Sequence, residues 1–196
     1  MTAPVASSPA AGHLFVFSGP SGTGKGTVLA ELTRRNPALW FSVSATTRAA
    51  RASEIDGRDY YFVSPQRFEE LIETDGLLEW ARVFDQYYGT PRAPIARQVA
   101  AGVDCLLDID VQGALQVHER MPEAVLIFLK PPSLEVLRER LTRRGTESAE
   151  EIERRLEGAA GEMAHESVYN YILVNETIDE TVARIEALLA AHRPKE

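Results

Sequence analysis

The sequence predicts an α/β fold in which one parallel sheet of about five strands is flanked by helices. Two observations favour this fold class. Apolar runs of four to six residues alternate with longer amphipathic stretches along the 196-residue chain. A glycine-rich segment lies between the first apolar run and the first amphipathic stretch, where a loop that binds phosphate is expected. Strands that alternate with helices form a parallel sheet covered on both faces.

The expected strands are the apolar runs at 13–17, 40–44, 104–108, 124–129 and 171–174. The expected helices span 25–36, 94–101, 111–120, 133–143, 150–164 and 178–192. Helical spacing is clearest at Leu134, Leu137 and Leu141, which have charged residues between them. Residues 177–180 read Thr-Ile-Asp-Glu, which is the spacing of a capping box at the start of the last helix.

Residues from about 45 to 90 interrupt this alternation. They contain a short run at 60–63, a helix at 65–73 and a longer run at 77–84, with turn signals at Asp56-Gly57 and Asp75-Gly76. This pattern predicts a small, mixed and partly antiparallel insert. A second irregular segment, 144–148, separates two arginine-bearing helices and is expected to act as a hinge.

One domain is therefore expected at 13–196, behind a disordered N-terminal tail at 1–12 that is rich in Ala, Ser and Pro. Its core would comprise 13–44, 91–136 and 158–196, its insert 45–90, and a helical lid 137–157.

The composition is that of an ordinary globular protein, with 44% hydrophobic and 26% charged residues. The net charge of −8 argues against a nonspecific nucleic-acid-binding protein. Arginine is nevertheless concentrated in two places, 48–58 and 138–155, which favours the handling of a small, highly charged anion.

The single cysteine, Cys105, excludes an intrachain disulfide, and its apolar surroundings predict a buried side chain. No apolar stretch approaches the roughly 18 residues of a membrane helix, and the N-terminus lacks the features of a signal peptide. We therefore expect a cytoplasmic protein that has no membrane partner.

Residues 19–27 read Gly-Pro-Ser-Gly-Thr-Gly-Lys-Gly-Thr. The glycines allow several backbone N–H groups to point at one anion, while Lys25 and the following helix add positive charge. This segment predicts a polyphosphate ligand, and a nucleoside triphosphate in particular. A glycine-rich turn without function is the alternative, which the preceding strand, the lysine spacing and the following helix argue against.

One position departs from the usual G-x-x-x-x-G-K-[ST] pattern, whose final hydroxyl ligates magnesium. Gly26 occupies that place, and the hydroxyl arrives one residue later at Thr27. The departure affects the metal contact and leaves the predicted phosphate cradle intact.

Arginines at 138–155 suit closure over transferring phosphates. Arg140 and Arg144 are four residues apart, which places them on one helix face, and Arg155 comes from the next helix. Three guanidinium groups there would stabilise charge that spreads over phosphoryl oxygens. The alternative is a solvated face on which the arginines pair with Glu135, Glu139 and Glu151.

A second phosphate ester is expected near Arg48, Arg51 and Tyr60, none of which a core needs. Further along, Glu79 would accept hydrogen bonds from the N1–H and the exocyclic amine of guanine, a pair of donors that adenine lacks. Hydroxyls that would donate to the guanine carbonyl are those of Ser44 and Thr90.

Six stretches now stand in a fixed order: SGPSGTGKGT, FSVSATTRAARASEIDGRDYYFV, LLEWARVFDQYYGTP, LLDIDVQGALQV, PPSLEVLRERLTRRGTE and YILVN. In these stretches the chain closely resembles the guanylate kinase family of nucleoside monophosphate kinases, over nearly its whole length from His13 to His192. The resemblance implies in-line transfer of a phosphoryl group from ATP to GMP, and to dGMP, giving GDP in purine nucleotide metabolism. It also implies magnesium as the ion that accompanies ATP.

The resemblance further assigns expected roles. ATP would be bound by Gly19, Pro20, Ser21, Gly22, Thr23, Gly24, Lys25, Gly26, Thr27, Arg144 and Asn175. GMP would be bound by Ser44, Arg48, Arg51, Glu54, Tyr60, Glu79, Tyr88, Thr90, Asp108 and Asp110, with Glu54 supporting the arginines. The catalytic residues would be Lys25, Arg48, Arg140, Arg144 and Arg155.

Two of these expectations have alternatives. Asp110 suits a helix cap for Val111 as well as a place in the site. Magnesium is expected to be held mainly by ATP oxygens and water, without a direct protein ligand, so that Thr27 or Asp108 belongs at most to its outer shell.

GMP is already ionised, so the expected reaction needs positioning and charge neutralisation rather than a general base. Two rival functions remain. One is a kinase for another monophosphate, which should lack the guanine-matched carboxylate. The other is a phosphopeptide-binding scaffold domain, which should have lost the working loop that Lys25 retains here. Nucleic acid is not an expected partner, and the chain is expected to be a monomer or a small homo-oligomer.

Overall fold

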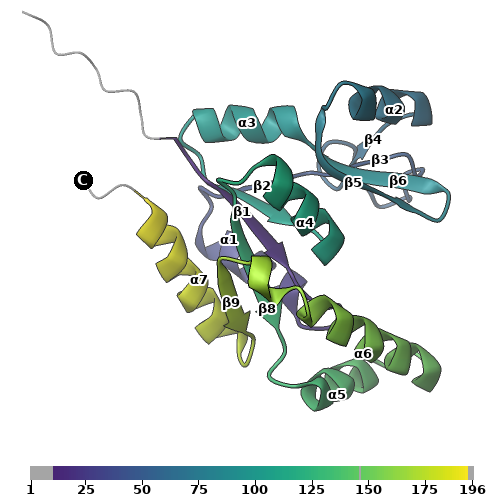
Figure 1. Ribbon diagram of the computed structural model, residues 1–196, viewed down its shortest axis with the longest axis vertical. Helices are drawn as coiled ribbons and strands as arrows, with labels where there is room; N and C mark the ends of the chain where they lie inside the picture. The colour runs from purple at the N-terminus through teal and green to yellow at the C-terminus, as the bar shows by residue number, and fades with distance from the viewer. Residues whose placement is uncertain (1–10, 146, 194–196) are drawn as a thin grey trace, which may run out of the picture.

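The structure, a computed structural model, describes residues 11–145 and 147–193, without the side chain of Arg144 (Figure 1). Most of the tail expected at 1–12 lies outside these residues. Within them, the chain forms two sheets and seven α-helices.

The larger sheet has five strands in the order β2-β7-β1-β8-β9, and every neighbouring pair is parallel, as predicted. Its strands are β1 Leu14–Ser18, β2 Trp40–Phe41, β7 Cys105–Asp108, β8 Val125–Lys130 and β9 Tyr171–Val174. All five residues of β1 are buried, because helices cover both faces of the sheet.

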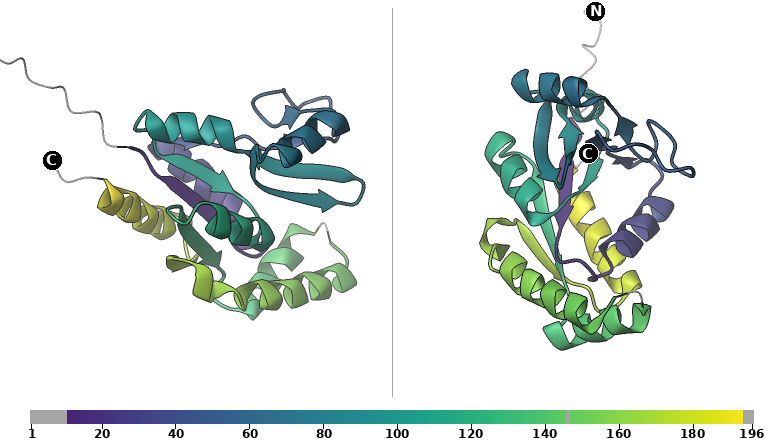
Figure 2. Two further views of the ribbon diagram at one scale, coloured as in Figure 1. Left: turned by 45° about the horizontal axis from the view of Figure 1, so that its top comes forward. Right: turned by 90° about the vertical axis from the view of Figure 1, so that its right-hand side faces the viewer.

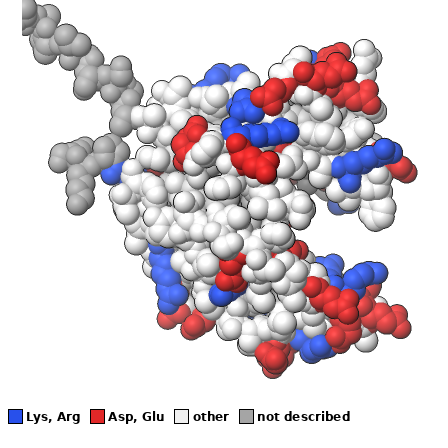
Figure 3. Space-filling view, viewed as in Figure 1, with Lys and Arg blue, Asp and Glu red and all other residues white. Residues whose placement is uncertain are grey.

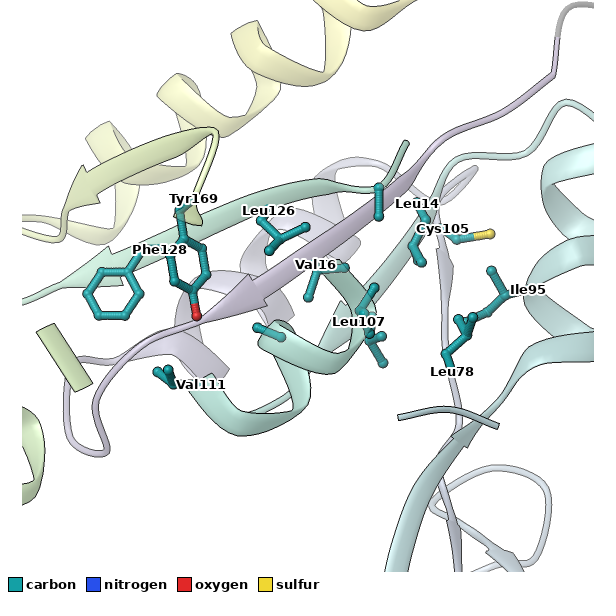
Figure 4. Close-up of a cluster of buried hydrophobic side chains, with 13 residues drawn as sticks. Leu14, Val16, Leu78, Ile95, Cys105, Leu107, Val111, Leu126, Phe128 and Tyr169 are labelled. Carbon is teal, nitrogen blue, oxygen red and sulfur yellow. The ribbon is translucent and has the colours of Figure 1, made fainter. Parts of the chain in front are cut away.

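The side chains of β1 alternate between two cores. Leu14 and Val16 pack with α3 and α4 on one face, together with fully buried Cys105 (Figure 4). Phe15 and Phe17 pack with α1 and α7 on the other face. These covering helices are α1 Lys25–Arg35, α3 Arg92–Ala100, α4 Val111–Arg120 and α7 Ile178–His192.

A smaller sheet, here called the insert sheet, has the order β4-β3-β6-β5. The pair β3–β4 is parallel, whereas β3–β6 and β5–β6 are antiparallel. Helix α2 packs on it through buried Phe68. The elements of this region are β3 Ala45–Thr46, β4 Tyr61–Phe62, α2 Pro65–Glu73, β5 Leu77–Val83 and β6 Gln86–Pro91.

Helices α5 Leu134–Arg144 and α6 Ala149–Met163 form a hairpin with its own apolar core. The short 3-10 helix η1 Glu166–Val168 follows it. The turn between α5 and α6 begins at Gly145, which has a left-handed φ of 68°. In Figure 1 and in the left view of Figure 2 this hairpin and the insert sheet project from the same side of the larger sheet, one above the other.

Two strand expectations needed correction. The strand expected at 40–44 ends at Phe41, and 45–46 belong to the insert sheet, because the chain crosses from one sheet to the other there. Strand β6 was not predicted, since its glycine and proline resemble a turn. No described helix is long and apolar enough to cross a bilayer.

Candidate active site

The glycine-rich loop lies at the carboxyl end of β1 and runs into the first turn of α1. Its glycines are needed for their backbone geometry. Gly19 has a φ of 140°, and a Cβ there would lie 2.0 Å from the carbonyl oxygen of Leu129. Gly22 and Gly24 also have positive φ values, of 92° and 89°. A larger residue at these positions would be strained, so this conformation depends on glycine.

Side chains from distant segments hold the loop in place. The Nδ2 of Asn175 donates to the carbonyl oxygen of Thr23 at 2.6 Å, and the hydroxyl of Thr181 donates to Oδ1 of Asn175 at 3.0 Å. Arg140 donates to the same Thr23 oxygen at 3.2 Å and to the carbonyl oxygen of Asn175 at 2.8 Å. Residues 22–24, 140, 143 and 175–178 line a pocket of about 360 Å³, called here the loop pocket.

Lys25 on α1 forms an ion pair with Asp108 at the end of β7. The neighbouring Asp110 caps α4, because its Oδ1 accepts from the backbone N–H of Gly113 at 2.8 Å. The cap considered for Asp110 is therefore present. Burial, together with the charge of Asp110, raises the pKa of Glu162, a residue of α6 that the sequence did not single out.

The α5–α6 hairpin contacts the loop directly. Arg155 Nη1 donates to the hydroxyl of Ser21 at 2.6 Å, and Arg155 also pairs with Glu147 at 3.4 Å. Arg138 pairs with Glu153 across the hairpin. Arg140 and Arg155 thus lie at the loop rather than on a purely solvated face. The prediction for the Arg144 side chain falls outside the described part of the structure.

A second pocket, called here the carboxylate pocket, has a volume of about 280 Å³. Its lining includes six residues predicted from the sequence: Ser44, Tyr60, Glu79, Tyr88, Asp108 and Asp110. Figure 3 shows the molecule hollowed between the insert sheet and the α5–α6 hairpin, with charged residues on both sides. Asp108 links this pocket to the glycine-rich loop, because it lines the pocket and pairs with Lys25.

Glu79 is the buried acid of the carboxylate pocket, with 7% of its surface exposed. Buried Thr90, opposite it on β6, donates its hydroxyl to Glu79 Oε1 at 2.5 Å. Burial raises the pKa of Glu79 to about 7, and the charge of Asp110 adds to this, while the Thr90 hydrogen bond opposes it. The free protein therefore holds a carboxyl group that titrates near neutral pH.

Beside Tyr60, which lines this pocket, Glu54 binds the guanidinium of Arg48 and the backbone of Arg51. Both of its carboxylate oxygens accept from the guanidinium of Arg48, at 2.8 and 2.9 Å, and Oε2 also accepts from the backbone N–H of Arg51 at 2.7 Å. These bonds lower the pKa of Glu54 to about 2 and keep it ionised. Arg48 also lies over the ring of Tyr60, 5.4 Å from its centroid.

The donor set near the loop suits magnesium as a hard cation with oxygen ligands. The carboxylate of Asp108 and the hydroxyl of Thr27 are oxygen donors, and Thr27 is exposed on the first turn of α1. No cluster of three or more His, Cys, Asp or Glu suited to a metal occurs among residues 11–145 and 147–193. Asp108 and Thr27 fit an oxygen-donating role beside such an ion.

Sequence reasoning missed several residues of the site. They include Arg143 in the loop pocket and Ala81, Val83 and Ile109 in the carboxylate pocket. It also missed Gly113 on α4, where a Cβ would lie 3.0 Å from Glu79 Oε2. A glycine inside a helical pattern is a usable signal for such close approach. The pocket-lining apolar residues carry no such signal.

A glycine-rich loop at the carboxyl edge of a parallel sheet, next to a second pocket with a buried acid, is typical of one class of protein: the nucleotide phosphotransferases. The guanylate kinase family model matches residues 11–192. The chain belongs to the guanylate kinase family and is therefore a transferase, a nucleoside monophosphate kinase.

Relatives and a solved structure agree with this membership. The chain is 51% identical to guanylate kinase of Gloeobacter violaceus, with 97% of this chain and 95% of that protein covered. It is 48% identical to guanylate kinase of Caldanaerobacter subterraneus, with 93% and 88% covered. The crystal structure of guanylate kinase from Anaplasma phagocytophilum is similar, with a TM-score of 0.72, 40% identity, and 95% and 88% covered.

Proposed function

We propose that this protein transfers the γ-phosphoryl group of ATP to the phosphate of GMP, and of dGMP, in purine nucleotide metabolism. The observation that carries the proposal is the buried Glu79–Thr90 pair in a pocket that shares Asp108 with the phosphate loop. This arrangement supports the view that the Glu79 carboxylate recognises the base of GMP close to the loop that binds the ATP phosphates. The carboxylate accepts from two guanine donors, which adenine and the pyrimidines do not present in that pattern.

On the ATP side, backbone N–H groups of the loop and the ammonium of Lys25 bind the phosphates. Asn175 and Arg140 keep the loop in shape through its Thr23 carbonyl. Arg155, which contacts Ser21, and Arg144 extend positive charge over the transferring group. Charge that develops on the phosphoryl oxygens is stabilised by groups already in place, and this is the main source of rate in such a site.

On the GMP side, Arg48, Arg51, Tyr60 and Tyr88 hold the phosphate ester, and Glu54 orients the first two. Ser44 and Glu79 bind the base, and the hydroxyl of Thr90 holds the Glu79 carboxylate. Asp108 and Asp110 border the region between the two nucleotides. The acceptor oxygen is already anionic, so no side chain needs to remove a proton. The chain's task is alignment and exclusion of water.

Magnesium bound with ATP would neutralise part of the phosphate charge. Thr27 and Asp108 are the residues that would hold its outer water shell. The ion pair of Asp108 with Lys25 supports a role for both groups at the phosphates of ATP.

We assign separate roles to the three segments expected from the sequence: the core, the insert and the lid. The core at 13–44, 91–136 and 158–196 carries the loop, the insert at 45–90 binds GMP, and the lid at 137–157 closes over ATP. Contact between α6 and the loop through Arg155 and Ser21 supports the role of the lid. We further propose a cytoplasmic monomer or small homo-oligomer without a nucleic-acid or membrane partner.

A coupled assay of ADP release tests the proposed function. ATP and magnesium are supplied with GMP, dGMP, AMP, UMP or dTMP, one acceptor at a time. We expect turnover with the two guanine nucleotides and less than about 1% of that rate with the others, given the discrimination that an unpaired buried polar group produces. Comparable turnover with AMP would reject guanine reading. No turnover with any acceptor would favour a binding module.

A further inference from the structure

Helix α4 of the core lies along β5, which is an edge strand of the insert sheet. The outward N–H and C=O groups of an edge strand need partners. Gln116 on α4 supplies both for one residue: its Oε1 accepts from the N–H of Trp80 at 3.2 Å, and its Nε2 donates to the C=O of Trp80 at 3.0 Å. One side-chain amide thus binds β5 as a neighbouring strand would.

The residue held in this way is the chain neighbour of Glu79. A second α4 side chain, Arg120, donates to the carbonyl oxygen of Leu77 at 3.2 Å. Helix α4 therefore holds β5 on both sides of Glu79, through side chains four residues apart on one helix face.

Gly113, one turn earlier on α4, faces the carboxylate itself. A Cβ at this position would lie 3.0 Å from Glu79 Oε2, closer than ordinary van der Waals contact. Glycine inside a helix lowers helix stability by about 1 kcal/mol relative to alanine. The close approach of Glu79 gives a structural reason for glycine at this position. Gly113, Gln116 and Arg120 share one face of α4, and that face surrounds Glu79 from its backbone to its carboxylate.

We propose that Gln116 is a positioning residue for guanine selectivity, which acts by holding the backbone of Trp80 and thereby the carboxylate of Glu79. This inference rests on the proposed function, because it assumes that Glu79 reads the base. Two parallel hydrogen bonds to guanine tolerate little displacement of their acceptors. A side chain that merely covered the strand edge would affect all acceptor nucleotides alike.

The test compares GMP with inosine monophosphate, which lacks the exocyclic amine of guanine. The selectivity is the ratio of kcat/KM for GMP to kcat/KM for inosine monophosphate. We expect Gln116→Met, which keeps the volume and removes both hydrogen bonds, to lower the selectivity about fivefold or more. Most of the change should lie in KM for GMP, with kcat and KM for ATP within twofold of wild type.

Three further variants complete the design. Gln66→Met makes the same chemical change on the exposed face of α2 and should leave the selectivity unchanged. Gln116→Glu keeps the volume and the bond from the Trp80 N–H but replaces the donating amide, so the selectivity should again fall. It is the second probe if Gln116→Met fails to fold in a thermal melt. Glu79→Gln should remove the selectivity, and adding Gln116→Met to it should change nothing more.

The outcomes distinguish the positioning role of Gln116 from base reading by Glu79. A fall in selectivity with Gln116→Met that vanishes in the Glu79→Gln background supports the positioning role. Unchanged selectivity in folded Gln116→Met or Gln116→Glu, with Glu79→Gln impaired, overturns that role and leaves the proposed function standing. Unchanged selectivity in Glu79→Gln overturns base reading by Glu79, and this inference with it.

Discussion

The hydroxyl of Thr90 donates to Oε1 of Glu79 at 2.5 Å, across neighbouring strands of the insert sheet. Both side chains are buried. Because Thr90 occupies one oxygen of the carboxylate, the other oxygen and the remaining lone pairs are left for a ligand. The hydrogen bond from Thr90 thus stabilises the Glu79 carboxylate as a hydrogen-bond acceptor in a buried site, where an unpaired charge would cost free energy.

The first prediction concerns pH. Burial raises the pKa of Glu79 to about 7, so the carboxyl is largely neutral below this pH and ionised above it. Only the ionised form accepts both guanine hydrogen bonds. We expect kcat/KM for GMP to fall about tenfold per pH unit as the pH drops below 7. Steady-state rates at saturating ATP between pH 5.5 and 8.5 measure this dependence.

Glu79→Gln is the control, because GMP's own phosphate also titrates, near pH 6. The variant should keep the phosphate's contribution and lose that of the carboxyl. Its stability supplies a separate check. The folded pKa of about 7 exceeds the ordinary 4.5, so wild type should lose stability relative to the variant as the pH rises from 4.5 through 7. Identical pH profiles for both proteins would contradict the assignment.

The second prediction concerns Lys25. Replacement by alanine removes the ammonium that pairs with Asp108 at the phosphate loop. We expect kcat to fall by about 10²-fold to 10³-fold or more, since charge stabilisation in the transition state is lost. GMP binding, measured by equilibrium titration without ATP, should change less than threefold. A kcat within tenfold of wild type would remove Lys25 from catalysis.

The third prediction concerns Gly26, which stands where the usual motif has a hydroxyl. A Cβ at Gly26 would have no heavy atom within 4 Å, so Gly26→Ser fits without rearrangement. The added hydroxyl should lower the magnesium concentration that gives half-maximal activity. The variant should also melt slightly higher, because serine favours a helix over glycine by a few tenths of a kcal/mol. Gly26→Ala separates the effects, since it should raise stability without changing the magnesium requirement.

The fourth prediction concerns Gly113. In Gly113→Ala the new methyl group meets Glu79 Oε2 at 3.0 Å, and the carboxylate must shift. We expect KM for GMP to rise about tenfold while KM for ATP stays within twofold. Gly158, an open position on α6, is the matched control. Gly158→Ala should stabilise its helix by about 1 kcal/mol and leave both KM values unchanged. Equal changes in both KM values of Gly113→Ala would show general damage instead.

Much of the core fold could be predicted from local pattern. The buried runs that became β1, β7, β8 and β9 were found because strands covered on both faces are apolar throughout. Strand β6 was missed because Gly89 and Pro91 resemble a turn and outweigh its strand-favouring tyrosines and threonine. Its pairing with β3 and β5 keeps it extended, and such pairing is nonlocal.

Many of the predicted site residues lie together in the structure. Ser44, Tyr60, Glu79, Tyr88, Asp108 and Asp110 line one pocket. The family resemblance had assigned all six in advance, but it did not indicate that Thr90 bonds Glu79 rather than pointing into the pocket. The resemblance did not point to Gln116 or Gly113. Their roles depend on contacts that α4 makes with β5 only in the folded protein.

The sequence by itself determined the glycine-rich loop with its lysine and most of the five-stranded core, since glycine spacing, lysine placement and apolar runs are local features. Only the tertiary structure decided how these residues are held. Asp108 meets Lys25 and Arg140 reaches the loop carbonyls because parallel strands end at one edge. The pKa of Glu79 depends on burial, which no single residue encodes and which arises when α4 packs against β5.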